Sequence, residues 1–194
     1  IDYSKNRISK KTLSLLFKLA EDAQLNEQMQ SLFTGANFNN ESLNNTENRH
    51  ALHTVLRRPH TDPTKDLIVD SENLSDAVRL CHIKMQRFLD KVHNNEYLGA
   101  KGKPIDTLVS IGIGGSFLGP KMVTDALVPY ALEGFQCHYV ANIDSTDLYE
   151  TLAKVDPDST LFLIQSKSFT TLDTLENANA VKSHLQSIGF SDSD

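Results

Sequence analysis

The sequence is poor in three features that would each indicate a particular class of protein. It has only two cysteines, Cys81 and Cys137, without CxxC or metal-ligand spacing, so we expect two reduced cytosolic thiols. Its longest apolar runs are about four residues, far short of the ~20 that span a membrane. Lysine and arginine (19) are fewer than aspartate and glutamate (25) and form no cluster, which argues against nucleic-acid and acidic-membrane partners.

Length and composition fit a soluble globular protein. The 194 residues, 39% of them hydrophobic, have room for one good core with an appended subdomain. No signal peptide opens the chain, and because it begins with Ile1 we expect part of the natural N-terminus to be missing. The formal net charge is −6, so an anion would have to be bound by a local site rather than by a global field.

The first half of the chain predicts helices. Apolar residues recur at helical spacing over residues 10–24, and an Asn-rich loop follows. Thr46 is a candidate N-cap for a second helix that ends before Pro59. A third helix is predicted over 75–92. The segment GAKGKP (99–104) marks the predicted boundary between a helical lead-in, residues 1–98, and the main domain, residues 99–194.

In the second half, strand and helix patterns alternate three times. The predicted strands cover 107–115, 135–143 and 160–166. The helices that follow them are predicted to start near Pro120 at N1, at a cap formed by Ser145 or Thr146, and at Thr170 or Thr171. This alternation predicts an α/β fold with a doubly wound parallel sheet and right-handed crossovers.

The loop IGIGGSFLGPK (111–121) follows the first of these strands. Its glycines at 112, 114 and 115 would let the backbone approach an anion, free amides at the helix start could donate to it, and Ser116 adds a hydroxyl. A dinucleotide fingerprint would need glycine where Phe117 stands, and a P-loop would need lysine in place of Pro120. Asp144 could still mimic a ribose-binding acid. A tight turn without a ligand is the other alternative.

The loop SKSFTTLDT (166–174) follows the third strand and is rich in hydroxyl groups. Ligands of open parallel sheets bind beyond the carboxyl ends of the strands, where this loop would meet the glycine loop. Small hydroxyls, backbone N–H groups and the single cation Lys167 suit a phosphate dianion. The alternatives are a capping box formed by Thr170 and Asp173 and an ordinary solvated lysine. The two loops together predict half of a monophosphate site.

Four separate blocks of the sequence resemble the glucose-6-phosphate isomerase family. They are DYSKNRI (2–8), NNTENRHALHTVLR (44–57), GKPIDTLVSIGIGGSFLGP (102–120) and QSKSFTTLDT (165–174). The resemblance implies a sugar-isomerase (SIS) domain with a five-stranded parallel sheet between helices. It implies interconversion of glucose 6-phosphate and fructose 6-phosphate through ring opening and a cis-enediol, without metal or cofactor. It also implies a cytoplasmic homodimer whose active sites borrow a residue from the partner subunit.

The resemblance assigns the substrate phosphate to seven residues of the two loops. They are Gly115, Ser116, Ser166, Lys167, Ser168, Thr170 and Thr171. Ser168 stands where the family has threonine, and Asp173 where it has glutamate, so the hydroxyl and the acid are kept. Leu172 and Phe117 replace polar residues, which puts contacts through those two side chains in doubt.

The family's catalytic residues have no counterpart in this sequence. The glutamate base, the ring-opening histidine and lysine, and the arginine that steadies the enediol all come later in the family's chain. Arg49, His50 and His53 lie in a matching block, but we interpret them as structural. We therefore expect an inactive piece that contains the first SIS domain and lacks the second. The alternative is a non-catalytic SIS module that senses a phosphosugar.

Overall fold

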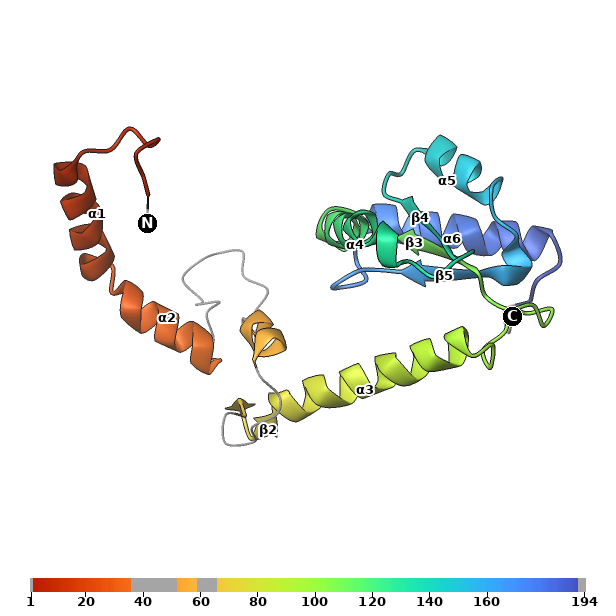
Figure 1. The fold of residues 1–194 in the computed structure, drawn as a ribbon, viewed down its shortest axis with the longest axis horizontal. Helices are drawn as coiled ribbons and strands as arrows, with labels where there is room; N and C mark the ends of the chain where they lie inside the picture. The colour runs from red at the N-terminus through yellow and green to blue at the C-terminus, as the bar shows by residue number, and fades with distance from the viewer. Residues whose placement is uncertain (1, 36–51, 59–65, 192–194) are drawn as a thin grey trace. The chain divides into compact units, whose positions relative to one another are not determined.

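The computed structural model describes residues 2–35, 52–58 and 66–191 (Figure 1). Contacts divide the chain into two compact units, residues 1–86 and 87–194. The assignment of a helical lead-in and a first sugar-isomerase domain stays a prediction. Among the described residues, no helix is both long and apolar enough to cross a membrane. Both cysteines are free, and burial raises the pKa of the Cys137 thiol, which makes it less reactive.

Two helices open the first unit. Helix α1 (Lys10–Asp22) begins with a capping box, in which the side chains of Ser9 and Thr12 accept hydrogen bonds from each other's backbone N–H. Helix α2 (Leu25–Thr34) follows at once, after Gln24 in the left-handed region. The predicted first helix is confirmed, but the sequence analysis missed α2. Its apolar residues 25, 29, 32 and 33 have helical spacing.

The rest of the first unit packs around a small apolar cluster. Its elements are the 3-10 helix η1 (His53–Arg57), the strands β1 (Ile68–Val69) and β2 (Glu72–Asn73), and helix α3 (Leu74–His93), which runs on past the end of the unit. Val55, Leu67 and Val78 are buried together. Helix α3 confirms the prediction for 75–92. Of the predicted second helix only the end is described, as a 3-10 turn, and Thr46, Arg49 and His50 lie outside the described residues.

The short hairpin β1–β2 was not predicted. Asp70 and Ser71 form its two-residue turn, and both have positive φ, at 50° and 68°. Two left-handed residues give a turn whose twist matches that of antiparallel strands. Asp-Ser is a weaker signal for this turn than Asn-Gly, and the strands are too short to show an alternating pattern.

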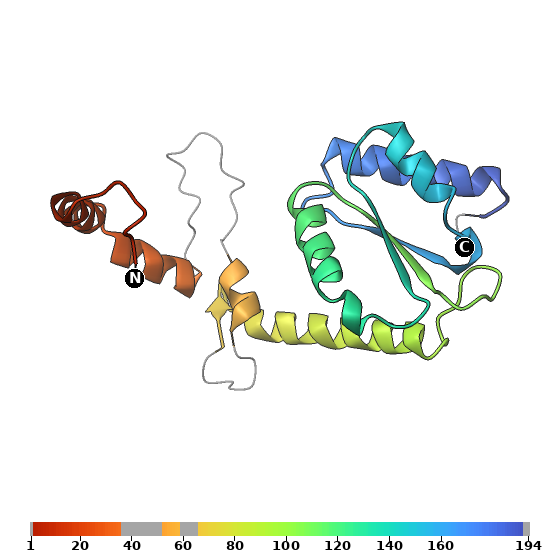
Figure 2. The same cartoon turned by 45° about the horizontal axis from the view of Figure 1, so that its top comes forward.

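The second unit is a three-layer α/β structure. Its elements are β3 (Thr107–Ile111), α4 (Gly115–Ala126), η3 (Val128–Tyr130), β4 (Gln136–Val140), α5 (Ser145–Leu152), η4 (Pro157–Ser159), β5 (Thr160–Ile164) and α6 (Leu172–Ser187). The described residues form one parallel sheet in the order β4-β3-β5. Helix α4 lies on one face of this sheet, and α5 and α6 lie on the other (Figure 2). The predicted doubly wound parallel sheet is confirmed, with three strands described.

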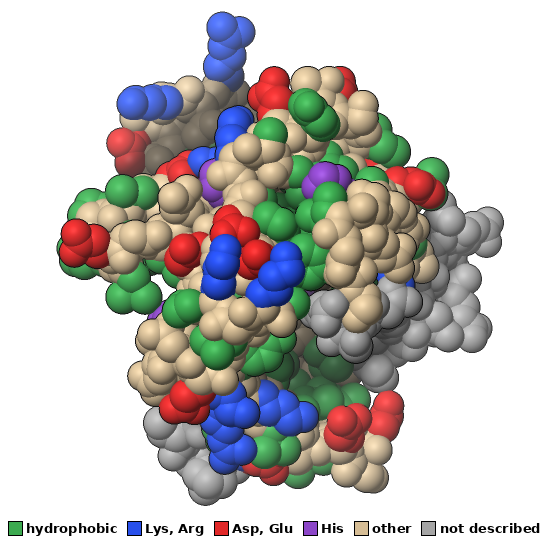
Figure 3. Space-filling view, turned by 90° about the vertical axis from the view of Figure 1, so that its right-hand side faces the viewer, with side chains coloured by type: hydrophobic (Ala, Val, Ile, Leu, Met, Phe, Trp, Pro, Cys, Tyr) green, Lys and Arg blue, Asp and Glu red, His purple; other side chains and the backbone are tan. Residues whose placement is uncertain are grey.

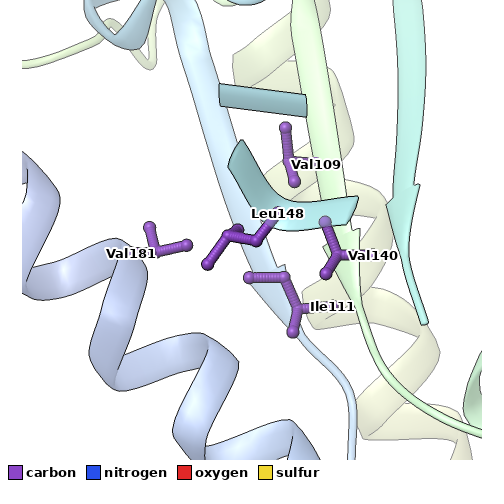
Figure 4. Packing of buried hydrophobic residues seen from close by; sticks show 5 residues of the cluster. All are labelled: Val109, Ile111, Val140, Leu148 and Val181. Atoms are coloured by element: carbon purple, nitrogen blue, oxygen red, sulfur yellow. The ribbon is translucent and has the colours of Figure 1, made fainter. Parts of the chain in front are cut away.

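The core of the second unit lies between the sheet and helices α5 and α6. Val109 and Ile111 of β3 and Val140 of β4 have no exposed surface, and they pack with Leu148 of α5 and Val181 of α6 (Figure 4). Strand residues two apart point to the same face, so one face of the sheet supplies all three. Strand β3 is paired on both sides, and its position is therefore fixed most firmly.

Two predicted helix starts are wrong. Helix α4 begins at Gly115, so Pro120 lies inside it instead of at N1. Because proline has no N–H, the Ser116 carbonyl loses its helical partner there. Helix α5 is capped by Asp144, which accepts a hydrogen bond from the Thr146 amide, and not by Ser145 or Thr146. The same bond lowers the pKa of Asp144. Thus Asp144 caps helix α5, and its suggested likeness to a ribose-binding acid stays a prediction.

A charged cluster holds the edge of the sheet opposite the carboxyl ends of its strands. The Lys103 Nζ lies 2.7 Å from Asp156 Oδ2 and 3.5 Å from Asp158 Oδ2. Here Gly99 packs directly on the chain, because a Cβ on it would lie 2.0 Å from the Asp158 carbonyl oxygen. The predicted boundary segment is thus a turn that packs against the loop before β5.

The pair formed by Lys103 and Asp156 predicts a pH dependence of stability. The Lys103 ammonium lowers the pKa of Asp156, and the pKa of Lys103 rises in return. Because the pKa of Asp156 is lowered, its carboxylate stabilises the folded state above the unfolded-state pKa of about 4, and this stabilisation is lost as the pH falls through the folded-state pKa. Because the pKa of Lys103 is raised, its ammonium stabilises the folded state below the unfolded-state pKa, and this stabilisation is lost as the pH rises through the folded-state pKa.

A double-mutant cycle in urea measures this pair. With Asp156→Asn, Lys103→Met and the double variant, we expect a small coupling energy at pH 7 that disappears as the pH falls below about 4. A coupling energy that stays constant down to pH 2.5 would show that the pair makes no charge-dependent contribution.

Candidate functional site

The parallel register brings the two predicted loops to the same edge of the sheet. Ile111 pairs with Ile164 at the carboxyl ends of β3 and β5, so residues 112–116 (the glycine loop) and 166–171 (the hydroxyl loop) start close together. The chain passes from β3 to β4 on one side and then to β5 on the other. The carboxyl ends of the adjacent strands β3 and β5 therefore form the topological switch point, where open α/β sheets bind ligands.

Gly112 packs closely against both Ser116 and the chain just before the hydroxyl loop. Its N–H continues the ladder to β4 by donating to the Val140 carbonyl at 3.2 Å. A Cβ on Gly112 would lie 2.9 Å from the Ser116 Cβ and 3.0 Å from the Gln165 carbonyl oxygen. Only glycine leaves room for both neighbours. The close approach at this glycine is to atoms of the chain itself, and the predicted approach of the loop backbone to an anion stays a prediction.

The rest of the glycine loop turns the chain into α4. Gly114 has φ 59° and ψ −119°, a combination that favours glycine. Gly115 is the first residue of the helix, and Ser116 is the second. In this first turn the Ser116 and Phe117 N–H groups donate to the carbonyls of Ile113 and Gly114, which leaves the Gly115 N–H, at the positive end of the helix dipole, to donate to an anion. The glycine loop thus presents the type of surface that binds anions.

Gln165 anchors the hydroxyl loop to the central strand. Its backbone N–H donates to the Ile111 carbonyl at 2.8 Å, and its side-chain amide donates to the buried Ser110 hydroxyl at 2.7 Å. Both bonds cross from the end of β5 to β3. The sequence analysis placed Gln165 only within the third predicted strand, since nothing in its type or spacing indicates a partner 55 residues away in sequence.

The hydroxyl loop is a tight turn with its own hydrogen bonds. The Ser166 hydroxyl oxygen accepts from the Phe169 N–H at 3.0 Å. The hydroxyls of Ser168 and Thr170 lie 2.7 Å apart. A hydroxyl that accepts keeps its own hydrogen for another partner. The loop therefore retains O–H donors that its internal bonds do not use.

Thr171 begins helix α6 but does not cap it with its side chain. Thr171 is the N-cap residue and makes no side-chain capping hydrogen bond. The alternative of a capping box formed by Thr170 and Asp173 is therefore wrong, although Asp173 does lie in the first turn. The helix start thus lacks an internal side-chain acceptor, and an external anion could take that place.

The predicted site residues lie on an open surface. Ser116 and Ser166 are half-buried, while Gly115, Lys167, Ser168, Thr170 and Thr171 are exposed. Acidic and basic side chains are interspersed on the face shown in Figure 3, which fits a protein that must bind an anion locally. Lys167 is the cation within the hydroxyl loop. Such an exposed surface can orient an anion with hydrogen-bond donors and a positive charge, but it does not enclose the anion. Other parts of a protein would have to cover it to exclude water from a substrate.

The two departures that replace a polar with an apolar residue, Phe117 and Leu172, supply no polar side-chain contact. The ring of Phe117 packs edge to face on Tyr139, with centroids 5.9 Å apart, and Tyr139 belongs to β4. Phe117 therefore joins α4 to the sheet. Leu172, in the first turn of α6, is 65% exposed. Its side chain offers only apolar surface beside the hydroxyl loop.

Asn177 is a further residue that the sequence analysis missed. It is buried in α6, and its side-chain amide donates to the Asn142 carbonyl at 2.8 Å. This bond holds the loop after β4 against α6 near the same sheet edge.

His53 is exposed in η1, in the first unit. The described residues contain no group of three or more His, Cys, Asp and Glu side chains that could hold a metal ion.

The chain matches a known protein family over almost its whole length. The family model described as phosphoglucose isomerase matches residues 2–194. The chain belongs to the phosphoglucose isomerase family. The glycine loop and the hydroxyl loop both lie within this match.

Curated relatives agree with this assignment. A glucose-6-phosphate isomerase of Marinomonas sp. (strain MWYL1) is 46% identical over all 194 residues, which cover 34% of that relative. One of Hahella chejuensis (strain KCTC 2396) is 46% identical over 178 residues, or 92% of this chain and 30% of the relative. This member of the phosphoglucose isomerase family therefore spans about a third of the length of the relatives it matches.

A solved structure also resembles the fold. The crystal structure of a glucose-6-phosphate isomerase from Chlamydia trachomatis D/UW-3/Cx matches with a TM-score of 0.73 and 30% sequence identity. The match covers 98% of this chain and 35% of that one. Sequence and fold thus give the same family.

Proposed function

We propose that this chain is the phosphate-binding part of an isomerase that interconverts glucose 6-phosphate and fructose 6-phosphate. One observation carries the proposal. In a chain of the phosphoglucose isomerase family, the glycine loop and the hydroxyl loop meet at the switch point of a parallel sheet. That is where the fold itself favours a ligand.

The two loops suit a phosphate monoester. Its dianion accepts several hydrogen bonds at once. The hydroxyls of the hydroxyl loop, the Ser116 hydroxyl, the Gly115 amide and the first amides of α6 would donate to it, and Lys167 would supply a positive charge. The two helix dipoles add to this at their N-termini. The sugar would extend outward from the cradle, away from the sheet.

The chemical step would need residues outside these 194. Aldose–ketose interconversion through a cis-enediol requires a base placed within reach of the proton between C1 and C2. The family resemblance places that base, and the ring-opening groups, beyond Asp194. In this proposal the cradle positions the phosphate end, so that binding energy from a non-reacting group orients the reacting carbons.

We further propose that the whole protein is a cytoplasmic homodimer and that a second SIS domain follows the first. The first SIS domain would have five parallel strands, of which the described residues form three. A stand-alone module that senses a phosphosugar would share the cradle. The family match that begins at residue 2 includes the N-terminal helices, and this supports the isomerase over the sensor.

Titration of the 194-residue chain with glucose 6-phosphate tests the proposal. We expect binding of glucose 6-phosphate, no binding of glucose, and no fructose 6-phosphate in a coupled assay. The double variant Ser166→Ala/Thr171→Ala should bind at least roughly 30-fold more weakly, because each lost donor to a charged acceptor is worth about 1–3 kcal/mol.

The control is Ser183→Ala/Ser187→Ala, which removes two exposed hydroxyls from the other half of α6. It should bind like the wild type. Equal affinity of the two double variants would contradict the assignment of the hydroxyl loop. Turnover by the isolated chain would contradict the placement of the base.

A further inference from the structure

Phe169 has an unusual backbone conformation in the middle of the hydroxyl loop. Its φ is 53°, in the left-handed region that side chains with a Cβ seldom adopt. Four other described non-glycine residues share a positive φ, namely Gln24, Asp70, Ser71 and Asn95. All four are polar. Phe169 is the one bulky apolar residue among them, in the part of the chain that the structure describes.

Burial of the ring does not explain this conformation. The Phe169 residue is 58% exposed, so little apolar surface is removed from water. The backbone is held by its neighbours instead. The Phe169 N–H donates to the Ser166 hydroxyl, Gln165 is fixed to β3, and Thr171 begins α6. A strained residue persists when the structure around it over-determines its conformation.

Two hydroxyls of the loop meet across the left-handed residue. The hydroxyls of Ser168 and Thr170, on either side of Phe169, lie 2.7 Å apart. One of them donates to the other, and the second keeps its hydrogen for an external acceptor. The Ser166 hydroxyl also keeps its hydrogen, because it accepts from the Phe169 N–H.

We propose that Phe169 is a positioning residue of the phosphate site and that it acts through its left-handed backbone, not through its ring. This rests on the proposed function. The turn at Phe169 aligns two O–H donors, one at Ser166 and one in the hydroxyl pair, before the phosphate arrives. Donors that are already aligned pay less ordering entropy on binding.

Three substitutions separate the backbone from the ring. Phe169→Asn and Phe169→Gly remove the ring but favour or permit the left-handed region. Phe169→Pro fixes φ near −65° and deletes the N–H. With glucose 6-phosphate as the probe in calorimetric titrations, we expect the Asn and Gly variants to bind within about threefold of the wild type. The Pro variant should bind about tenfold or more weakly.

Two further measurements keep the result decisive. The one-bond Cα–Hα coupling constant of Phe169 in the unliganded chain should report a positive φ, and melting temperatures should show that each variant folds. Affinity lost in the Asn and Gly variants, or retained in the Pro variant, would overturn the role of the backbone. A negative φ in the free chain would also overturn it. If the Pro variant does not fold, the Asn and Gly variants and the coupling constant decide the question.

Failure of the proposed function gives a different result. In that case the wild-type chain itself would not bind glucose 6-phosphate, whatever the conformation of Phe169. If the wild type binds glucose 6-phosphate but the affinities of the Phe169 variants do not follow the expected order, only the proposed role of Phe169 is wrong.

Discussion

Replacing Gly112 with alanine is expected to damage both the stability of the second unit and the proposed phosphate site. The new Cβ would lie 2.9 Å from the Ser116 Cβ, 3.0 Å from the Gln165 carbonyl oxygen and 3.1 Å from the Ser116 carbonyl oxygen. Two of these are backbone atoms of ordered elements, so the strain cannot be relieved by rotating a side chain. We expect a loss of about 1–3 kcal/mol in unfolding free energy.

The same substitution should move the two loops apart. Ser116 and Gln165 belong to the glycine loop and to the anchor of the hydroxyl loop, and a Cβ at Gly112 would press on both. Affinity for glucose 6-phosphate should therefore fall by about tenfold or more, as expected when a charged hydrogen bond is lost. Urea unfolding and titration of the same sample measure the two effects.

Gly119→Ala is the matched control. Gly119 lies in α4, has no atom within 4 Å of an added Cβ, and its φ is not positive. Alanine is favoured over glycine inside a helix by about 1 kcal/mol, so this variant should be as stable as the wild type or more stable. If both alanine variants were equally stable and bound equally well, the close approach of the two loops at Gly112 would be wrong.

Replacing Ile111 with alanine should give the largest loss of stability. Ile111 has no exposed surface and packs in the cluster that joins the sheet to α5 and α6. It also lies in β3, which is paired on both sides, so the structure has little freedom to close the cavity. We expect a loss of about 2–5 kcal/mol, measured by urea unfolding followed by circular dichroism.

Ile143→Ala serves as the control for this experiment. Ile143 follows β4 and is 51% exposed, so the same atoms are removed with little change in burial. The loss there should be about 0.5 kcal/mol or less, as for most surface substitutions. Similar losses at the two positions would mean that the core is not where the structure places it.

The parallel sheet and the shared edge of the two loops were predictable because they depend on simple periodicities. Runs such as TLVSI (107–111) and TLFLI (160–164) mark buried strands, and helical patterns between them require a parallel sheet. The carboxyl ends of parallel strands lie at the same end of the sheet. The glycine loop and the hydroxyl loop, which follow two such strands, therefore had to lie near each other if these strands were neighbours. The register of Ile111 with Ile164 confirms this.

Details that depend on distant contacts were not predictable. Asp144, Ser145 and Thr146 are all good capping residues, so sequence alone did not select Asp144. The bond from Gln165 to Ser110 and that from Asn177 to Asn142 join segments far apart in sequence. The left-handed φ of Phe169 contradicts the preference of its residue type, and only the neighbouring hydrogen bonds explain it.

The central position of β3 has a consequence for the order in which this region forms. Thr107 pairs with Gln136 in β4 and with Thr160 in β5. During synthesis the first of these partners leaves the ribosome well before the second. A two-stranded intermediate can therefore exist while the β5 side of the central strand is still unsatisfied and able to pair wrongly. The hydroxyl loop follows β5, so the two loops can meet only after β5 has paired with β3.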